Sequence, residues 1–456
     1  MNLFLFDDDT APLPPITMSQ VVQRVLSVFD ALSRGFGPAP GVWLRCREDV
    51  LVDAKSVDER VRAGERLPLV GTLVAVPDDP VIVGRLARAG GVVAGHTVPG
   101  AMAAMSEARL ETLSKLDALL VSEPPSMCRD VVGFVPTRGL IPLGGPGIGT
   151  VLAREAAVAQ QVAAAVTGRD PRIGHSRDWP DSVRLSAGDH PRVGVPDGAS
   201  RARLDAPVRA RLEATVDTLR VVGALVDEVD LGGENGWCLR RAAFTLHEHD
   251  ALLTPLGDEV GSLSQLVTRL DTAAVLIPAA DGKGMGVVTK PFDDQVALDL
   301  AGLLTGSQAS HPYPDTGVGL VAFGAYLRGQ PRADDLIGAG ARFAGFVTTA
   351  RHYRMLLLQR DPPEAGVVDA GNSQKGGPLV GERWLLSPSA LGEFVAHLPP
   401  PMRLGTVELS DGTTSLAILC DPAVAERGED LTAWQCWRAY LRHLSALRPI
   451  AAQAES

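Results

Sequence analysis

The corner at Pro136–Gly139 constrains this chain more than any other short stretch, because a Pro-Thr-Arg-Gly turn there separates two apolar runs. Two valines lead into Gly133 before the turn, and the run after it ends in the paired glycines Gly144 and Gly145. Proline fixes one backbone dihedral angle and glycine tolerates conformations that other residues avoid, so the sequence predicts a tight turn between two strands. Arg138, inside the turn, is suited to hold it by binding a carboxylate or backbone carbonyls.

The order of the predicted elements indicates an α/β fold. From Arg192 onward the sequence alternates between strands and helices, and such alternation is typical of parallel strands joined by crossover helices. Upstream, residues 17–20 predict a capping box for a helix that ends at Gly35. The remaining predictions are helices over 48–64, 152–167, 204–221 and 237–247, a helix from Pro80, and strands over 42–46, 69–76, 91–97, 116–121, 251–255 and 273–278.

Composition excludes several classes of protein. The 456-residue chain is long enough for two or three domains, and its net charge of −11 argues against a nucleic-acid or membrane-surface partner. Its five cysteines are scattered and never spaced C-x-x-C, which indicates free thiols in a reducing compartment and no zinc site. We expect no other metal and no cofactor. The acidic N-terminus is unlike a signal peptide, and no apolar run is long enough to span a bilayer. We therefore expect a cytoplasmic protein.

A second domain is predicted after a linker at 306–316, which is rich in Ser, Pro and Gly. Short β-rich runs replace the long alternation from residue 317 to the end of the chain. They include a hairpin that turns at Asp411-Gly412, and a helix over 431–447 follows. The sequence thus predicts a large domain over 1–305 and a small α+β domain over 317–456.

These runs resemble the amidase-signature enzymes, and among them the allophanate hydrolases, from about residue 17 to 441. The Pro136–Gly139 corner resembles the "VGLKPTRG" corner that follows the family's catalytic serine loop, and Gly41–Gly71 resembles the N-terminus of allophanate hydrolases. The runs GLVAFGAYLRGQP, ARHYRMLLLQ and AWQCWRAYL resemble their C-terminal domain, which is thought to decarboxylate the first product. The resemblance implies an amidase-signature-like mixed sheet covered by helices, followed by a small α+β domain with a γ-glutamylcyclotransferase-like fold.

The residues that carry out amide hydrolysis in this family do not have counterparts in the chain. The family's general base is a lysine after the strand at 69–76, but here Val76 is followed by Pro77-Asp78-Asp79-Pro80 and then directly by a helix. None of the five lysines is expected to follow a buried strand as that base does. The family's glycine- and serine-rich loop is also missing, and Ser122 or Ser126 is what remains near the nucleophile's place. A serine without an aligned base is a poor nucleophile, and both also suit a turn beside two prolines.

Other candidates for ligand contacts follow from the resemblance. Trp237 and Arg241 match a helix whose tyrosine and arginine hold the substrate carboxylate in allophanate hydrolases, although Gly233 stands at the tyrosine position. A helix-surface arginine is the alternative. In the C-terminal domain, Tyr326 replaces the family's histidine in a tight loop.

Gly324, Tyr326 and Leu327 form this loop, which is suited to anion binding. Glu382 is the best carboxylate near such a pocket, and the alternative for it is an exposed glutamate at a strand edge. The acidic and histidine-rich run at 247–250 lacks the spacing of a metal motif.

Three functions are compatible with this sequence. The first is a pseudoenzyme that binds a small carboxylate or urea-like molecule or supports a partner enzyme, and the second is an enzyme with altered chemistry in a reshaped cleft or C-terminal pocket. The third, an active allophanate hydrolase with an unrecognised base, is disfavoured. We expect a homodimer through the large domain, and a cleft above Pro136–Gly139 whose floor is faced by Arg241.

Overall fold

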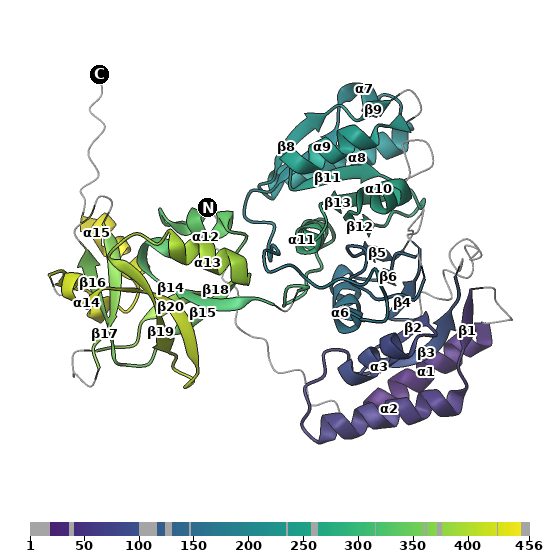
Figure 1. The fold of residues 1–456 in the computed structure, drawn as a ribbon, viewed down its shortest axis with the longest axis horizontal. Coiled ribbons are helices and arrows are strands. Elements are labelled where there is room, and N and C mark those ends of the chain that lie inside the picture. Colours follow the sequence, from purple (N-terminus) through teal and green to yellow (C-terminus); the bar gives the residue numbers. More distant parts are fainter. Residues whose placement is uncertain are drawn as a thin grey trace. The chain divides into compact units, whose positions relative to one another are not determined.

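The structure, a computed structural model, describes residues 19–35, 41–99, 116–123, 130–145, 147–233, 236–256, 263–314, 316–358, 360, 363–371, 376–425 and 427–447. Contacts divide the chain into two compact units: unit 1 comprises Met1–Trp179 and Pro191–Tyr313, and unit 2 comprises Pro180–His190 and Pro314–Ser456. The division after Tyr313 falls within the predicted linker. Nothing in the sequence indicates that Pro180–His190 belongs to unit 2. Figure 1 shows the helices and strands of both units, coloured along the sequence.

Unit 1 is built on one mixed sheet, in which the described residues form eleven strands in the order β1-β3-β2-β4-β6-β5-β12-β13-β11-β7-β8. The strands are β1 Val42–Leu44, β2 Leu73–Pro77, β3 Val92–Thr97, β4 Ala118–Val121, β5 Val132–Val135, β6 Thr150–Ala153, β7 Arg192–Pro196, β8 Leu225–Val229, β11 Ala251–Pro255, β12 Ala273–Ile277 and β13 Met285–Thr289. Most of these strands are short runs of Val, Leu and Ala buried along their length, as expected of strands covered on both faces. A separate hairpin pairs β9 Gly232–Gly233 with β10 Gly236–Trp237.

Helices pack against this sheet. They are α1 Ser19–Gly35, α2 Arg47–Arg62, α3 Pro80–Ala89, α6 Ala156–Val166, α7 Gly198–Arg201, α8 Ala206–Val221, α9 Leu239–Glu248, α10 Leu263–Leu270 and α11 Asp294–Thr305. Of these, α11 is buried continuously from Asp294 to Gly302 and contacts β12, β13 and α6. α11 is therefore the central helix that packs against the middle of the sheet.

Strand directions bring several loops to one edge of the sheet. β2, β3 and β4 are parallel to one another. β5 runs in the same direction as β4, because both strands are antiparallel to β6. β13 runs in the same direction as β5, because both strands are antiparallel to β12. We call this the corner edge, and it carries Asp78, Ser122, Pro136 and Lys290, the residues that follow β2, β4, β5 and β13. β7, β8 and β11 run the opposite way and end at the opposite edge.

A buried carboxylate holds the Pro136–Gly139 corner in place. Asp294 Oδ1 accepts a hydrogen bond from Thr137 N at 2.7 Å, and its Oδ2 accepts one from Thr137 Oγ1 at 2.6 Å. Thr137 Oγ1 in turn accepts a hydrogen bond from Phe292 N at 2.7 Å. The turn also needs a glycine at position 139, since φ is +85° there and a Cβ would lie 2.2 Å from His175 O. The corner is thus tied to the first turn of α11.

Several sequence predictions need correction in unit 1. The run at 152–167 was expected to be one helix, but its start belongs to the buried strand β6 and α6 begins only at Ala156. α9 begins at Leu239, not at Trp237, because Trp237 lies in β10. β2 begins at Leu73 because residues 69–72 form a turn. The predicted capping box at 17–20 lies largely outside the described residues.

Unit 2 has a five-stranded sheet in the order β15-β18-β14-β20-β19 and a three-stranded sheet in the order β17-β16-β21. Its strands are β14 Val318–Ala322, β15 Arg342–Thr348, β16 Tyr353–Leu358, β17 Glu364–Asp369, β18 Val380–Leu386, β19 Met402–Glu408, β20 Thr414–Cys420 and β21 Glu429–Asp430. The helical segments are η1 Gly324–Tyr326, α12 Ala333–Gly338, α13 Pro388–Ala396, α14 Pro422–Ala425, η2 Thr432–Trp434 and α15 Trp437–Leu447.

Two predictions for this unit can be compared with the structure directly. The predicted hairpin at Asp411-Gly412 is confirmed, with β19 paired antiparallel to β20. The predicted helix at 431–447 is divided, because Gln435 has a positive φ that ends η2 before α15 starts. Within the ranges that the structure describes, no helix combines the length and the apolar character needed to cross a bilayer.

The buried Asp294 leads to a prediction about pH. Burial raises the pKa of this carboxyl from 3.8 to about 7, although its two hydrogen bonds from Thr137 act in the opposite direction. Between these two pH values the folded state therefore keeps a proton on Asp294 that the unfolded chain has released. Binding of this proton stabilises the folded state; its full contribution is present below pH 4 and is lost as the pH rises to about 7. Between pH 5 and pH 8 we expect Asp294 to cost the wild type about 2–3 kcal/mol of unfolding free energy.

Asp294→Asn has no such proton, so its unfolding free energy is expected to fall less over the same interval. Urea denaturation of both proteins at pH 5 and pH 8 measures the difference, and all other titrating groups cancel between them. Parallel pH profiles of the wild type and the variant would contradict the assignment.

Candidate functional site

The loop after β2 holds a capping acid where the resemblance places a catalytic lysine. Asp79 is the N-cap of α3, and its Oδ1 accepts hydrogen bonds from Val81 N at 2.8 Å and Ile82 N at 3.3 Å. Asp79 N donates a hydrogen bond to Pro77 O at 2.8 Å. Only two residues, Asp78 and Asp79, connect β2 to α3. The backbone here passes directly from strand to helix, and the side chain at this position is an acid committed to the helix start.

Ser122 lies on the corner edge, directly after β4. Its carbonyl accepts a hydrogen bond from Ile148 N at 2.9 Å, and Gly147 packs so closely that a Cβ there would lie 2.3 Å from the same oxygen. No hydrogen bond joins the Ser122 hydroxyl to another described residue. Ser126 lies outside the described residues. The contacts of Ser122 are thus structural, and its backbone makes them.

One lysine does follow a buried strand, contrary to the expectation from the sequence. Lys290 comes directly after β13, whose five residues are all buried. The strands β6, β5 and β12 lie between β4 and β13, so about 19 Å of sheet separates Lys290 from Ser122. A general base must come within hydrogen-bond reach of the proton that it removes. Lys290 is therefore not placed to activate Ser122.

The arginine that fastens the Pro136–Gly139 corner is Arg177, not Arg138. Arg177 Nη1 donates to Arg138 O at 3.2 Å and to Asp271 Oδ2 at 2.6 Å, and its guanidinium lies 4.3 Å from the centroid of the Phe292 ring. The Arg138 side chain forms no hydrogen bond or ion pair with the residues described. The predicted contact to a carboxylate and a carbonyl exists, but it comes from a residue 39 positions further along the chain.

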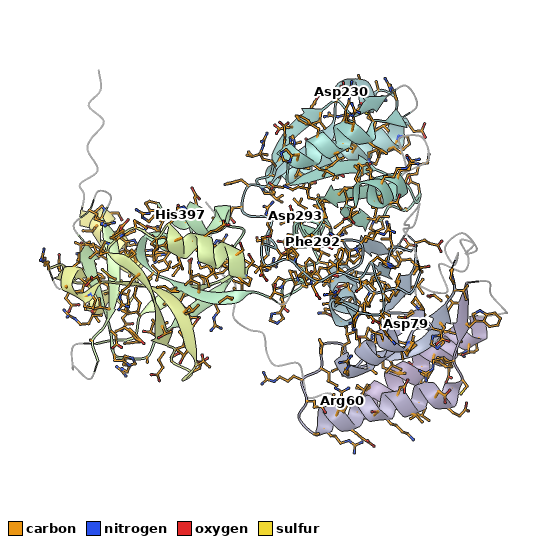
Figure 2. All side chains as sticks on the ribbon, in the orientation of Figure 1. Arg60, Asp79, Asp230, Phe292, Asp293 and His397 are labelled. Carbon is orange, nitrogen blue, oxygen red and sulfur yellow. The ribbon has the colours of Figure 1, made fainter. Side chains whose placement is uncertain are left out.

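Arg241 does not face the corner, so that expectation was wrong. Its guanidinium forms an ion pair with Asp230, which follows β8 at the opposite edge of the sheet. Four strands lie between β5 and β8, and Figure 2 places Asp230 at one end of unit 1, away from Phe292 and Asp293. Arg241 is half-exposed beside a groove of about 470 Å³ that also contains Glu248 and His249. A neighbouring acid neutralises this arginine.

Other residues singled out in the sequence around α9 lie in the β9–β10 hairpin before it or follow its end. Trp237 and Gly233 lie in the β9–β10 hairpin, where Trp237 pairs with Gly232 and Gly233 with Gly236. The His249 ring is buried between Thr245 O at 3.0 Å and Asp227 Oδ2 at 3.1 Å. Over the described part of the chain, no three His, Cys, Asp or Glu side chains are grouped as metal ligands would be.

Glu382 lies in the interior of unit 2, so the alternative of an exposed strand-edge glutamate was wrong. It belongs to β18, between β15 and β14, and is only 1% exposed. Its Oε2 accepts a hydrogen bond from Arg328 N at 2.8 Å, and Arg438 Nη2 lies 2.8 Å from its Oε1. Arg438 Nη2 also donates a hydrogen bond to Arg328 O at 2.6 Å. Among the described residues, Oε1 is thus paired with the guanidinium charge but accepts no aligned hydrogen bond.

The predicted loop reaches Glu382 through its backbone. Gly324 has a φ of +60°, and a Cβ there would lie 2.9 Å from Ala365 O, so this turn requires glycine. The amides of Tyr326 and Leu327 bond to carbonyls of the same turn, and the amide of Arg328 bonds to Glu382. These three amides are occupied, so the expectation that the loop offers them to an anion is not met.

Tyr326 and Leu327 are part of the core. The Tyr326 ring packs edge-on against Phe394, with its centroid 5.8 Å away, and the Arg332 guanidinium lies 5.8 Å from the Tyr326 ring. Burial raises the pKa of the Tyr326 hydroxyl to about 12, so it remains protonated near neutral pH. None of the described residues forms a hydrogen bond with this hydroxyl. Leu327 is 1% exposed in a neighbouring apolar cluster.

Comparison with known proteins identifies the C-terminal part of the chain. Residues 318–442 match the family "Allophanate hydrolase C-terminal domain". The urea amidolyases of Lachancea kluyveri and Saccharomyces cerevisiae are 24% and 25% identical to this chain over 217 residues. That alignment covers 40% of this chain and only 12% of each urea amidolyase, so the chain matches a small part of these relatives.

Solved structures extend the likeness to the fold of nearly the whole chain. A structure of Kluyveromyces lactis allophanate hydrolase superimposes with a TM-score of 0.68 at 17% identity, covering 94% of this chain and 99% of that one. The K. lactis urea amidolyase gives a TM-score of 0.70 at 17% identity, covering 94% of this chain and 36% of that one. The fold class predicted from the sequence and the resemblance to allophanate hydrolases are therefore confirmed.

The two arginines of the corner lead to a prediction about stability. Arg177→Ala removes a charge-assisted contact with Asp271, a hydrogen bond to the corner and the contact with the Phe292 ring, so we expect a loss of about 1–2 kcal/mol of unfolding free energy. Arg138→Ala removes no described contact and is expected to change stability by less than about 0.5 kcal/mol. Urea denaturation of both variants checks this, and equal losses would show that Arg177 does not hold the corner.

Proposed function

We propose that this chain, whose residues 318–442 match the allophanate hydrolase C-terminal domain, is a non-hydrolytic relative of the allophanate hydrolases. Its function is to bind a small carboxylate with urea-like N–H groups in unit 2 without cleaving a C–N bond. The observation that carries the proposal is Glu382, a buried carboxylate with one oxygen that accepts no hydrogen bond from the described residues.

The corner edge of unit 1 supports the loss of hydrolysis. Asp79 caps α3 where a base would stand, and Lys290 is too distant to serve Ser122. In serine hydrolases the nucleophile and its base act as a unit, and removing a member of the unit lowers turnover by several powers of ten. A serine hydroxyl without a base is therefore not expected to attack an amide at a useful rate.

The pairing of Glu382 with Arg438 supports the choice of ligand. Glu382 Oε1 is an unsatisfied acceptor suited to N–H donors, and the adjacent Arg438 guanidinium suits a carboxylate. A molecule with both groups, such as a carboxylated amide or urea, complements the pair. Because the relatives that match part of this chain are urea amidolyases, urea-derived acids are the first candidates.

The first prediction is that the purified full-length chain releases no ammonia from allophanate, malonamate or urea. The reason is that no base faces Ser122 among the described residues, and a coupled assay for ammonia measures the release. Ser122→Ala should match the wild type, as should Ser27→Ala, a control on the surface of α1. Ammonia release that Ser122→Ala abolishes and Ser27→Ala preserves would contradict the proposal.

The second prediction concerns binding to unit 2. Calorimetry with malonamate, malonate and urea is expected to detect binding, strongest for malonamate because it has both an amide and a carboxylate. Glu382→Gln replaces the acceptor with an amide of the same shape, and loss of one charge-assisted hydrogen bond should weaken binding about ten- to a hundredfold.

Glu364→Gln is the matched control for this experiment. Glu364 is also buried in unit 2, but Arg332 and Arg360 contact its two oxygens at 2.8 and 3.3 Å, so each oxygen already accepts a hydrogen bond. Arg241→Ala tests the site rejected above and is expected to bind normally. Equal losses in the Glu364 and Glu382 variants, or a loss confined to the Arg241 variant, would overturn the assignment to Glu382.

A further inference from the structure

A cavity of about 180 Å³ lies in unit 1 beside α9, where β12 begins and β13 ends. Three polar residues, Thr272, Lys290 and His247, line it together with the apolar Leu246, Leu270 and Pro291. All of them belong to unit 1, so this cavity is separate from Glu382 in unit 2. It also differs from the groove beside Arg241, with which it shares no lining residue.

Thr272 brings an unpaired hydroxyl to the cavity. The residue is only 1% exposed, yet its Oγ1 has no hydrogen-bond partner within the described ranges of the chain. A buried hydroxyl without a partner is unfavourable, and in native proteins such a group calls for an explanation. The preceding residue, Asp271, has a positive φ of +52° and is held by Arg177 at 2.6 Å, so the backbone that carries the hydroxyl is fixed.

Lys290 supplies a positive charge next to this hydroxyl. In the pairing of β12 with β13, Ala273 stands opposite Thr289, so the next position along places Thr272 opposite Lys290. Directly opposed residues on antiparallel strands have their Cβ atoms about 5 Å apart. The nearest carboxylate to the Lys290 ammonium is Asp293, at 3.9 Å, beyond hydrogen-bond distance. The ammonium therefore keeps donors for a ligand, as far as the described residues are concerned.

The size and lining of the cavity define the ligand. Its volume corresponds to about six water molecules at the ~30 Å³ that each takes in the liquid, which suits a molecule of a few heavy atoms. The hydroxyl and the ammonium suit a carboxylate, while Leu246, Leu270 and Pro291 suit a short hydrocarbon chain. An inorganic anion would leave the apolar wall without a partner, and a neutral amide would not use the charge.

We propose that this cavity is a binding site for a short aliphatic monocarboxylate. The carboxylate contacts Lys290 and Thr272, and the hydrocarbon chain lies against Leu246 and Leu270. The site lies on the corner edge of the sheet, beside the corner that Asp294 holds. It does not depend on the function proposed for unit 2.

Calorimetry on the full chain with butyrate tests the proposal, with butyramide and inorganic phosphate as matched probes. Butyrate is expected to saturate the wild type at millimolar concentrations, and butyramide and phosphate to bind at least tenfold more weakly. Lys290→Met and Thr272→Val are each expected to weaken butyrate binding at least tenfold. Thr272→Val keeps the shape of the side chain and removes the unpaired hydroxyl, so its melting temperature should equal or exceed that of the wild type.

Two controls separate this site from others. Lys283→Met removes a lysine of unit 1 that lies 3.0 Å from Asp205, outside the cavity, and is expected to leave butyrate binding unchanged. Glu382→Gln is expected to leave it unchanged as well, so failure here is distinct from failure of the site in unit 2. Absence of saturation in the wild type, equal binding in the Lys290 and Lys283 variants, or tighter binding of phosphate than of butyrate would each overturn the proposal.

Discussion

The contact between Asp294 and Thr137 is the interaction on which the rest of unit 1 depends. It joins two residues 157 positions apart, and it places the start of α11 against the end of β5. Carboxylates are favoured at the start of a helix, where free N–H groups and the helix dipole offset part of the cost of burial. Both oxygens are used by a single residue of the corner, so the strand and the helix are fixed in orientation as well as in distance.

Under the non-hydrolytic function proposed above, this arrangement explains how the fold persists without amide hydrolysis. The corner and α11 are held by Asp294, Thr137 and Arg177, and none of these contacts involves the loops after β2 or β4. Those loops can therefore change without disturbing the centre of the sheet. In this chain the loop after β2 has become a two-residue connection capped by Asp79. The contacts that hold the centre of the fold therefore do not depend on the residues of these two loops.

The sequence predicts the elements whose periodicity is unambiguous. The prediction fails where the apolar residues of a strand run directly into those of a helix. The strands β3, β11 and β12 and the helix α1 are bounded by clear breaks and were predicted nearly to the residue. β6 was missed because its buried residues run without a break into an Ala/Val-rich helix, and only Glu155, without a side-chain cap, marks the boundary. β13 was missed as well, and with it the position of Lys290 after a buried strand.

The contacts of the candidate sites were harder to predict, because they join residues far apart in the sequence. Arg177 and Asp271 are 94 positions apart, and nothing in the residues around either one indicates the other. Arg241 was placed by its position in a motif, but its partner Asp230, only 11 residues earlier, was overlooked. The run that contains Arg438 was noted in the sequence only as part of a resemblance, so its approach to Glu382 appeared only in three dimensions.

Two buried glutamates of unit 2 differ in how completely their carboxylates are hydrogen-bonded. Glu364 meets two arginines and both of its oxygens accept hydrogen bonds, which is what a purely structural carboxylate requires. Glu382 is equally buried and also meets an arginine, but one of its oxygens is left without a hydrogen bond. Buried ion pairs contribute little net stability even when complete, so an incomplete one is not explained by stability. The two residues therefore differ at one carboxylate oxygen, which in Glu382 is paired with a charge but accepts no hydrogen bond from the described residues.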